Sequence, residues 1–184
     1  MQNKYYLFLQ TQPENKELYH KYHSEKRKER GDSGVDLFFT KDQILPANSV
    51  SKIDLEVNGL LLYWKGETVH PLEYINYQSV FPKSSYWLIP RSSIVKTPLI
   101  LKNSLGLIDS EYQGNLMVFV LNHSNDDYEI KRGQSLFQLT TATLEVFEDV
   151  IISEEDIYKG IKSKRGSGGF GSTNEFYESL KKNE

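Results

Sequence analysis

The sequence predicts an all-β domain, a sandwich or a barrel, and three features indicate this. Polar and apolar residues alternate through Lys52–Val57, which is the pattern of a half-buried strand. Leu116–Leu121 is an unbroken apolar run, which is typical of a strand buried on both faces. Turn-forming residues follow at Asn122–Asp127, and further strand-like stretches lie at Val35–Phe39 and Leu136–Phe147.

Helical character is confined to two stretches, so we expect little helix. Glu14–Arg30 places Leu18 and Tyr22 at helical spacing and ends in the charged run Glu25–Arg30. We interpret this run as a solvated segment of mixed charge, and a phosphate-binding role is the alternative. The C-terminal stretch Asn174–Glu184 begins with a residue suited to a helix N-cap.

Composition limits the classes of protein that fit. The 184 residues suit one domain, and the net charge of −3 gives no electrostatic footprint for long nucleic acid. The absence of cysteine excludes disulfides, thiol nucleophiles and zinc–thiolate sites. The apolar run Tyr5–Leu9 is too short for a signal peptide or a membrane span. We therefore expect a soluble intracellular protein, in cytoplasm or nucleus, that contacts neither a membrane nor nucleic acid directly.

Three short segments carry groups that suit phosphate oxygens. Gly34–Leu37 places one acid, Asp36, at the start of a predicted strand, where a plain turn is also compatible. Pro90–Ser93 offers an arginine fork and two serine hydroxyls, although a helix N-cap would use the same residues. Gln138 interrupts an apolar strand and needs a partner, either a neighbouring strand or a ligand.

Asn103–Met117 is the segment richest in chemical groups, and it is predicted to be a hairpin. A hairpin can present backbone groups to the edge of a base, and Asn103 can both donate and accept a hydrogen bond. Asp109 at the turn can act as a general base toward water, and Tyr112 could stack against a sugar. A purely structural hairpin, with Asp109 as a turn former, is the alternative.

The fifth segment, Arg165–Thr173, lies in the Gly/Ser-rich stretch Lys162–Ser172, which is interpreted as a flexible arm. Its glycines would let the backbone approach phosphates closely, and its arginine, serines and threonine supply donors. Phe170 would bury nothing in such an arm unless it closed over a ligand. A tail of chance composition is the alternative.

These five segments, in this order, resemble the five motifs of the trimeric dUTPase family. Gly106–Gly114 and Arg165–Thr173 are the most specific, and Gly31–Phe38 with Pro90–Leu99 is similar to the malaria-parasite branch. The resemblance implies a distorted jelly-roll, the dUTPase-like β-clip, that assembles into a homotrimer. It also implies a jelly-roll domain over residues 1–161 and an arm over residues 162–184 that closes over a neighbouring subunit's site.

The resemblance implies hydrolysis of dUTP to dUMP and pyrophosphate, which keeps uracil out of DNA and supplies dUMP for dTMP synthesis. Asp109 would activate the water. Asp36 would support a Mg²⁺ ion that triphosphate and water hold, with no direct protein ligand. Tyr112 would lie under the deoxyribose. The other implied substrate-binding residues are Arg91, Ser92, Ser93, Asn103, Gly106, Leu107, Met117, Gln138, Arg165, Phe170, Gly171, Ser172 and Thr173.

The sequence departs from the family pattern at Ser135–Phe137, where a charged residue and small apolar residues are usual, and at Leu60–Leu88, which is extended and aromatic. The extension is interpreted as a lengthened surface hairpin or, alternatively, a partner-binding patch. An arm that follows the long stretch 149–163 is expected to be poorly tied to its own domain. Two rival functions remain. One is dCTP deamination, since dCTP deaminase shares the fold, and the other is non-catalytic nucleotide binding.

Overall fold

The computed structural model describes residues 4–23, 26–64, 82–163 and 165–169. Strands dominate this part of the chain, which confirms the all-β prediction, and the helical segments are η1 (Pro13–His23), α1 (Lys26–Glu29) and η2 (Ser92–Lys96). The strands are β1 (Lys4–Thr11), β2 (Val35–Leu37), β3 (Gln43–Leu45), β4 (Ser49–Asp54), β5 (Val57–Trp64), β6 (Lys83–Ser84), β7 (Tyr86–Pro90), β8 (Leu99–Leu101), β9 (Gly106–Ile108), β10 (Met117–Asn122), β11 (Tyr128–Ile130), β12 (Phe137–Thr141) and β13 (Asp149–Ser153).

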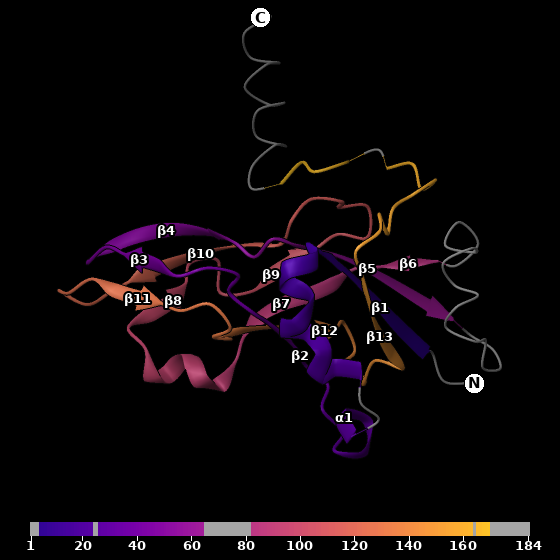
Figure 1. The fold of residues 1–184 in the computed structure, drawn as a ribbon, viewed down its shortest axis with the longest axis horizontal. Helices are drawn as coiled ribbons and strands as arrows, with labels where there is room; N and C mark the ends of the chain where they lie inside the picture. Colours follow the sequence, from indigo (N-terminus) through magenta and orange to yellow (C-terminus); the bar gives the residue numbers. More distant parts are fainter. Residues whose placement is uncertain (1–3, 24–25, 65–81, 164, 170–184) are drawn as a thin grey trace, which may run out of the picture.

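The strands form four small sheets, in the manner of the distorted jelly-roll that was predicted. Their orders are β13-β1-β5-β6, β2-β12-β7-β9, β4-β10-β8 and β11-β3. In Figure 1 the sheet that contains β1 and β5 lies at one end of the molecule, β4, β10 and β8 lie at the other, and β7, β9, β12 and β2 lie between them. No helix in the described part of the chain is long and apolar enough to cross a membrane.

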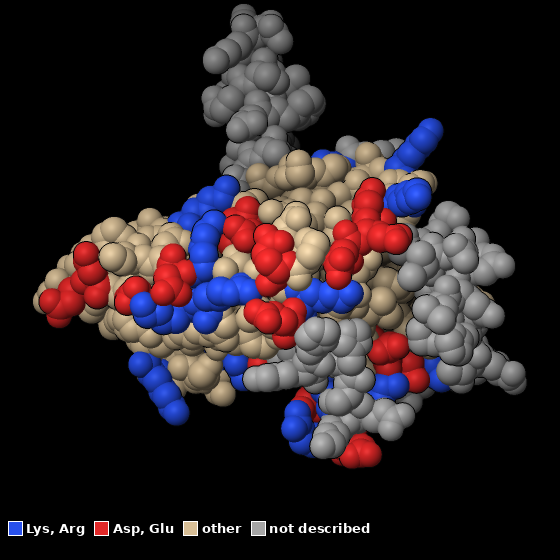
Figure 2. Space-filling view, in the orientation of Figure 1, with Lys and Arg blue, Asp and Glu red and all other residues tan. Residues whose placement is uncertain are grey.

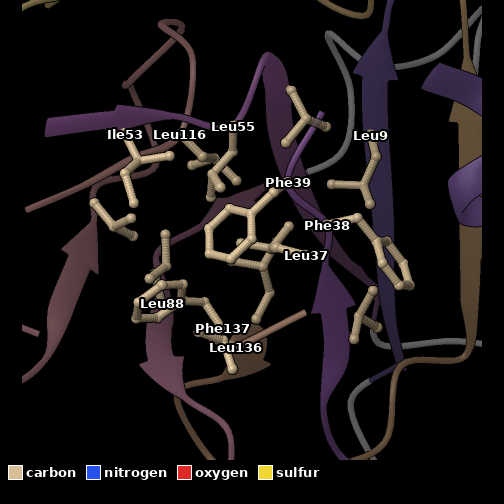
Figure 3. Close-up of a cluster of buried hydrophobic side chains, with 14 of the residues drawn as sticks. Leu9, Leu37, Phe38, Phe39, Ile53, Leu55, Leu88, Leu116, Leu136 and Phe137 are labelled. Atoms are coloured by element: carbon tan, nitrogen blue, oxygen red, sulfur yellow. The ribbon is translucent and has the colours of Figure 1, made fainter. Parts of the chain in front are cut away.

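Alternating apolar residues of these strands point into one main core. Phe39 and Phe137 meet there edge to face, with ring centroids 6.2 Å apart, a favourable arrangement for aromatic pairs. Figure 3 shows both rings among leucines from several strands, including Leu37 and Leu88. Phe137, which departs from the family pattern of small apolar residues, is completely buried in this core.

Two strand predictions need correction in detail. Lys52–Val57 is not one strand, because Glu56 has a positive φ of 52° and the chain turns between β4 and β5. Leu116–Leu121 corresponds to β10, but only alternate residues are fully buried in the single chain. The remaining side chains of β10 lie on a face of its sheet that is partly open to solvent. An unbroken apolar run does not distinguish such a strand from one that is buried on both faces.

The charged run 25–30 is exposed at residues 28–30, as expected of a solvated segment, but Arg27 departs from this interpretation. Arg27 in α1 is only 4% exposed, and its guanidinium donates to the carbonyl of Phe147 at 2.7 Å. Its burial is possible because these charge-assisted hydrogen bonds replace water. Phosphate binding, the alternative interpretation of the run, can therefore apply only to residues other than Arg27.

The stretch 149–163, which precedes the arm, is tied to its own domain. β13 pairs in parallel with β1, and Ile157 and Tyr158 are buried beyond it. The predicted extension at 60–88 begins as a hairpin, since β5 pairs with β6 in antiparallel register. Three of its seven aromatic residues, Tyr74, Tyr77 and Phe81, and the predicted C-terminal helix lie outside the described residues.

Candidate functional site

Residues 103–117 border a small cavity of about 160 Å³, here called the hairpin cavity. These residues do not form the predicted β-hairpin, because β9 pairs with β7 whereas β10 pairs with β4 and β8; we keep the name hairpin for this segment. β9 places Ile108 on a sheet edge beside β7, and Asp109 follows as the chain turns back toward β10. The amide of Tyr112 donates to the carbonyl of Asp109 at 3.0 Å and so closes this turn. The cavity is lined by Asn103, Leu107, Ile108, Asp109, Tyr112, Met117, Arg165 and Gly169.

Tyr112 is held rigidly at the base of the hairpin cavity. Its side chain is 8% exposed, and its hydroxyl donates to the carbonyl of Asn115 at 2.7 Å. A Cβ at Gly114 would lie 2.6 Å from this hydroxyl, so only glycine fits there. Burial raises the pKa of Tyr112, with the charge of Asp54 adding to the effect. The side chain is therefore a neutral, fixed wall of the cavity.

A second layer supports the hairpin from behind. The hydroxyl of Tyr158 lies 2.7 Å from the carbonyl of Gly59 and 3.1 Å from the carbonyl of Tyr112. The hydroxyl of Ser163 donates to the carbonyl of Glu111 at 2.6 Å. No motif indicates these contacts, which join residues 46 to 99 positions apart in the sequence.

The described part of the arm lies on its own chain's hairpin. Arg165 forms an ion pair with Asp109. The amide of Gln113 donates to the carbonyl of Gly166 at 2.8 Å, within a parallel bridge between Gly166 and Tyr112. The single chain thus brings Arg165 to the predicted base, whereas Phe170, Gly171, Ser172 and Thr173 lie outside the described residues.

A second cavity, of about 390 Å³ and mostly polar, lies elsewhere; we call it the arginine cavity. Its lining residues are Arg30, Asp32, Ser33, Gly34, Asp36, Arg91, Ser92 and Gln138. Asp36 on β2 and Gln138 on β12 are direct partners in one sheet, and Arg91 directly follows β7 on the other side of β12. Three elements distant in sequence therefore deliver the predicted phosphate ligands to one place.

Contacts within the arginine cavity orient its polar groups. The Nε atom of Arg91 lies 2.9 Å from a carboxylate oxygen of Asp36, and one terminal nitrogen donates to the carbonyl of Ser135 at 3.1 Å. The side chain of Gln138 lies so close to Gly34 that a Cβ there would come within 2.0 Å of its oxygen. Gly34 thus makes room for Gln138, which is partly buried and donates to the carbonyl of Pro90 on β7 at 3.4 Å.

The predicted residues are divided between the two cavities. Neither of these two cavities contains members of both sets. Ser93 and Gly106 line neither cavity: the hydroxyl of Ser93 faces the carbonyl of Ser135 at 3.4 Å, and Gly106 pairs with Leu88 in the sheet. Arg30, Asp32 and Ser33 line the arginine cavity but were not selected as site residues from the sequence.

Comparison with known proteins gives consistent matches. The sequence model of the dUTPase family matches residues 72–174. A deoxyuridine 5'-triphosphate nucleotidohydrolase of Hamiltonella defensa is 41% identical over 91 residues, 49% of this chain and 57% of that protein. One of Clostridium acetobutylicum is 25% identical over 145 residues, 78% of this chain and 83% of that protein.

A solved structure described as native EIAV dUTPase is similar with a TM-score of 0.45 and 23% sequence identity. The alignment covers 73% of this chain and 85% of the other. In the matches to Polynucleobacter asymbioticus, Hamiltonella defensa and Aeromonas hydrophila proteins, this chain spans a little over half of each relative's length.

Proposed function

Since this chain belongs to the dUTPase family, we propose that it hydrolyses dUTP to dUMP and pyrophosphate. The observation that carries the proposal is the hairpin cavity, where Asp109 and the fixed ring of Tyr112 face the same small space. Such an activity would keep uracil out of DNA and supply dUMP for dTMP synthesis. dCTP deamination and non-catalytic nucleotide binding are the alternatives that the assay below separates.

In this proposal the hairpin cavity takes the nucleoside. Asn103 and the backbone near Leu107 and Met117 bind the uracil edge, since a side-chain amide and backbone groups supply both donors and acceptors. Tyr112 lies against the deoxyribose and leaves no room for a 2′-hydroxyl. Asp109 positions a water molecule and takes its proton as the water attacks the α-phosphorus.

The arginine cavity takes the phosphates. Arg91, Ser92 and Gln138 provide donors, with Ser93 nearby, and Asp36 holds the Arg91 fork in place. Within the described residues no group of three acidic, histidine or cysteine side chains is arranged to hold a metal ion. We propose that Mg²⁺, held by phosphate oxygens and water with Asp36 in support, neutralises charge that develops on the phosphates.

We further propose that the working enzyme is a homotrimer whose subunits share each site. The separation of the two cavities supports this, because a single substrate needs both sets of residues. An apolar row across one sheet also supports it: Val50, Leu121 and Ile100 are direct neighbours on β4, β10 and β8, and two of them are about half exposed. Such a row favours contact with another subunit.

The arm belongs to the same proposal. We propose that Arg165 and the residues up to Thr173, with Phe170 over the uracil, close a site on a neighbouring subunit. Exchange of arms around a ring would replace the Arg165–Asp109 pair within one chain by the same pair, or a phosphate contact, between two chains.

One assay tests the activity. The purified protein is incubated with dUTP and Mg²⁺, and pyrophosphate release is measured, with dCTP, dTTP and UTP as control substrates. We expect release from dUTP alone and its suppression by EDTA, reversed by added Mg²⁺. Ammonia from dCTP would instead indicate a deaminase, and nucleotide binding without any product would indicate a non-catalytic protein.

A further inference from the structure

The arginine cavity has a second cation that the family resemblance did not supply. Arg30 lies just after α1, in the segment 30–34 that forms one wall of this cavity. Asp32 and Ser33 of the same segment also line it. The charged run therefore ends at the place where the phosphates of the proposed substrate would lie, although its sequence carries no phosphate-binding motif.

Buried contacts fix the position of this wall. The guanidinium of Arg27 donates to the carbonyl of Asp32 at 3.0 Å and to the carbonyl of Phe147 at 2.7 Å. The amide of Asp32 donates back to the carbonyl of Arg27 at 3.1 Å, and Gly31 makes the turn with a φ of 70°. The wall is thereby fastened to the body of the domain, and Arg30 projects from an anchored loop.

Arg30 and Arg91 are presented in the same way. The Nε atom of Arg30 donates to a carboxylate oxygen of Asp32 at 2.9 Å, as that of Arg91 lies 2.9 Å from a carboxylate oxygen of Asp36. A guanidinium has five N–H groups, so each pair leaves donors available to a phosphate. Arg30 is the more accessible of the two, since its side chain is 69% exposed against 33% for Arg91.

We propose that Arg30 is a further substrate-binding residue, which contacts the β- or γ-phosphate of the nucleotide and the pyrophosphate that leaves. The inference rests on the proposed function, because it assumes that the arginine cavity takes the phosphate chain. Neighbouring Lys28 offers a contrast: it lies on α1, pairs with Glu148 at 3.4 Å and lines a different cavity. Figure 2 shows that acidic and basic side chains are interspersed on the face in view.

The test measures binding of three probes by calorimetry in Mg²⁺: pyrophosphate, dUMP and the non-hydrolysable α,β-imido analogue of dUTP. The Arg30→Gln variant should bind pyrophosphate and the analogue about fivefold more weakly, as befits one exposed charge-assisted contact. Its affinity for dUMP should equal that of the parent. The Lys28→Gln variant removes the same charge two residues away and should bind all three probes like the parent.

A double variant separates direct contact from charge balance. Arg30→Gln leaves Asp32 unpaired, and this carboxylate could itself repel phosphate. If Arg30 contacts phosphate, Arg30→Gln with Asp32→Asn remains weakened toward pyrophosphate. Parental affinity in the double variant, an unchanged Arg30→Gln variant, or equal weakening in Lys28→Gln would each overturn the inference. Failure of the parent to bind the dUTP analogue would instead count against the proposed function.

Discussion

Asp109 is the residue on which the proposed chemistry depends most. Replacing it by asparagine keeps its size but removes the basic oxygen, so Asp109→Asn should lower turnover of dUTP more than tenfold, or about 1.4 kcal/mol of barrier. Binding of the α,β-imido analogue should remain within about threefold of the parent, or about 0.6 kcal/mol. Steady-state kinetics and calorimetry measure the two quantities.

Glu111 provides a matched control for this substitution. It lies two residues further along the same hairpin. Its carboxylate pairs with Lys83, and Glu111 does not line the hairpin cavity. Glu111→Gln should therefore retain turnover close to that of the parent. Substantial turnover in Asp109→Asn, or an equal loss in Glu111→Gln, would show that Asp109 is not the base.

Tyr112 should set the choice between deoxyribose and ribose. Its ring is fixed by burial and by the hydrogen bond to Asn115, so it cannot swing aside for a 2′-hydroxyl. Tyr112→Ala should raise kcat/KM for UTP relative to dUTP by about tenfold or more, since rejection by a steric wall is lost with the wall. An unchanged ratio in competition assays would assign Tyr112 a purely structural role.

At the scale of elements, Tyr158 couples the segment after β13 to the hairpin. Tyr158→Phe removes the hydroxyl that donates to the carbonyl of Tyr112, whereas the carbonyl of Gly59 keeps the hydroxyl of Tyr86 as a donor. The free energy of unfolding should fall by about 1–2 kcal/mol, the usual cost of an unpaired buried group. Urea unfolding measures it, with Tyr128→Phe as a control whose hydroxyl makes a single long contact of 3.5 Å. Equal stability of the two variants would contradict this role.

The strands could be predicted from sequence because alternation reports directly which face of a strand is buried. The turn between β4 and β5 could not, because Glu56 adopts a positive φ without the glycine or asparagine that usually signals one. The burial of Arg27 could not be predicted either. Its partner Phe147 is 120 residues away in the sequence. A run of similar charged residues does not indicate which side chain is buried.

For the whole molecule, the motifs identified most residues that line the two cavities, because phosphate and base recognition require particular side chains. The motifs did not reveal that the predicted residues of one chain are divided between two cavities. The spacing of motifs along the sequence does not indicate how far apart they lie in the fold. They also missed Arg30 and Tyr158, whose roles depend on where the chain folds back. Asp109 and Arg165 are 56 positions apart, yet they meet in the structure.

If two subunits complete one site, defects in the two cavities should complement each other. Arg91→Gln and Asp109→Asn should each be nearly inactive as pure trimers. Random equal mixing should restore about a quarter of parental activity, because three quarters of the trimers are mixed and each then contains one intact site of three. Co-refolding with mass spectrometry to confirm mixing measures this. A mixture that stays inactive would place both cavities of one site in a single chain.

The arm can be assigned by the same count. In the single chain Arg165 is paired with one of the two carboxylate oxygens of Asp109. We expect this pair within one chain to separate and the arm to serve a neighbouring subunit. Arg165→Ala mixed with Asp109→Asn should recover about a quarter of parental activity, by the counting that holds for a closed ring of three. Recovery in the Arg91→Gln mixture but not in this one would mean that each arm closes over its own chain's hairpin, as it lies in the single chain.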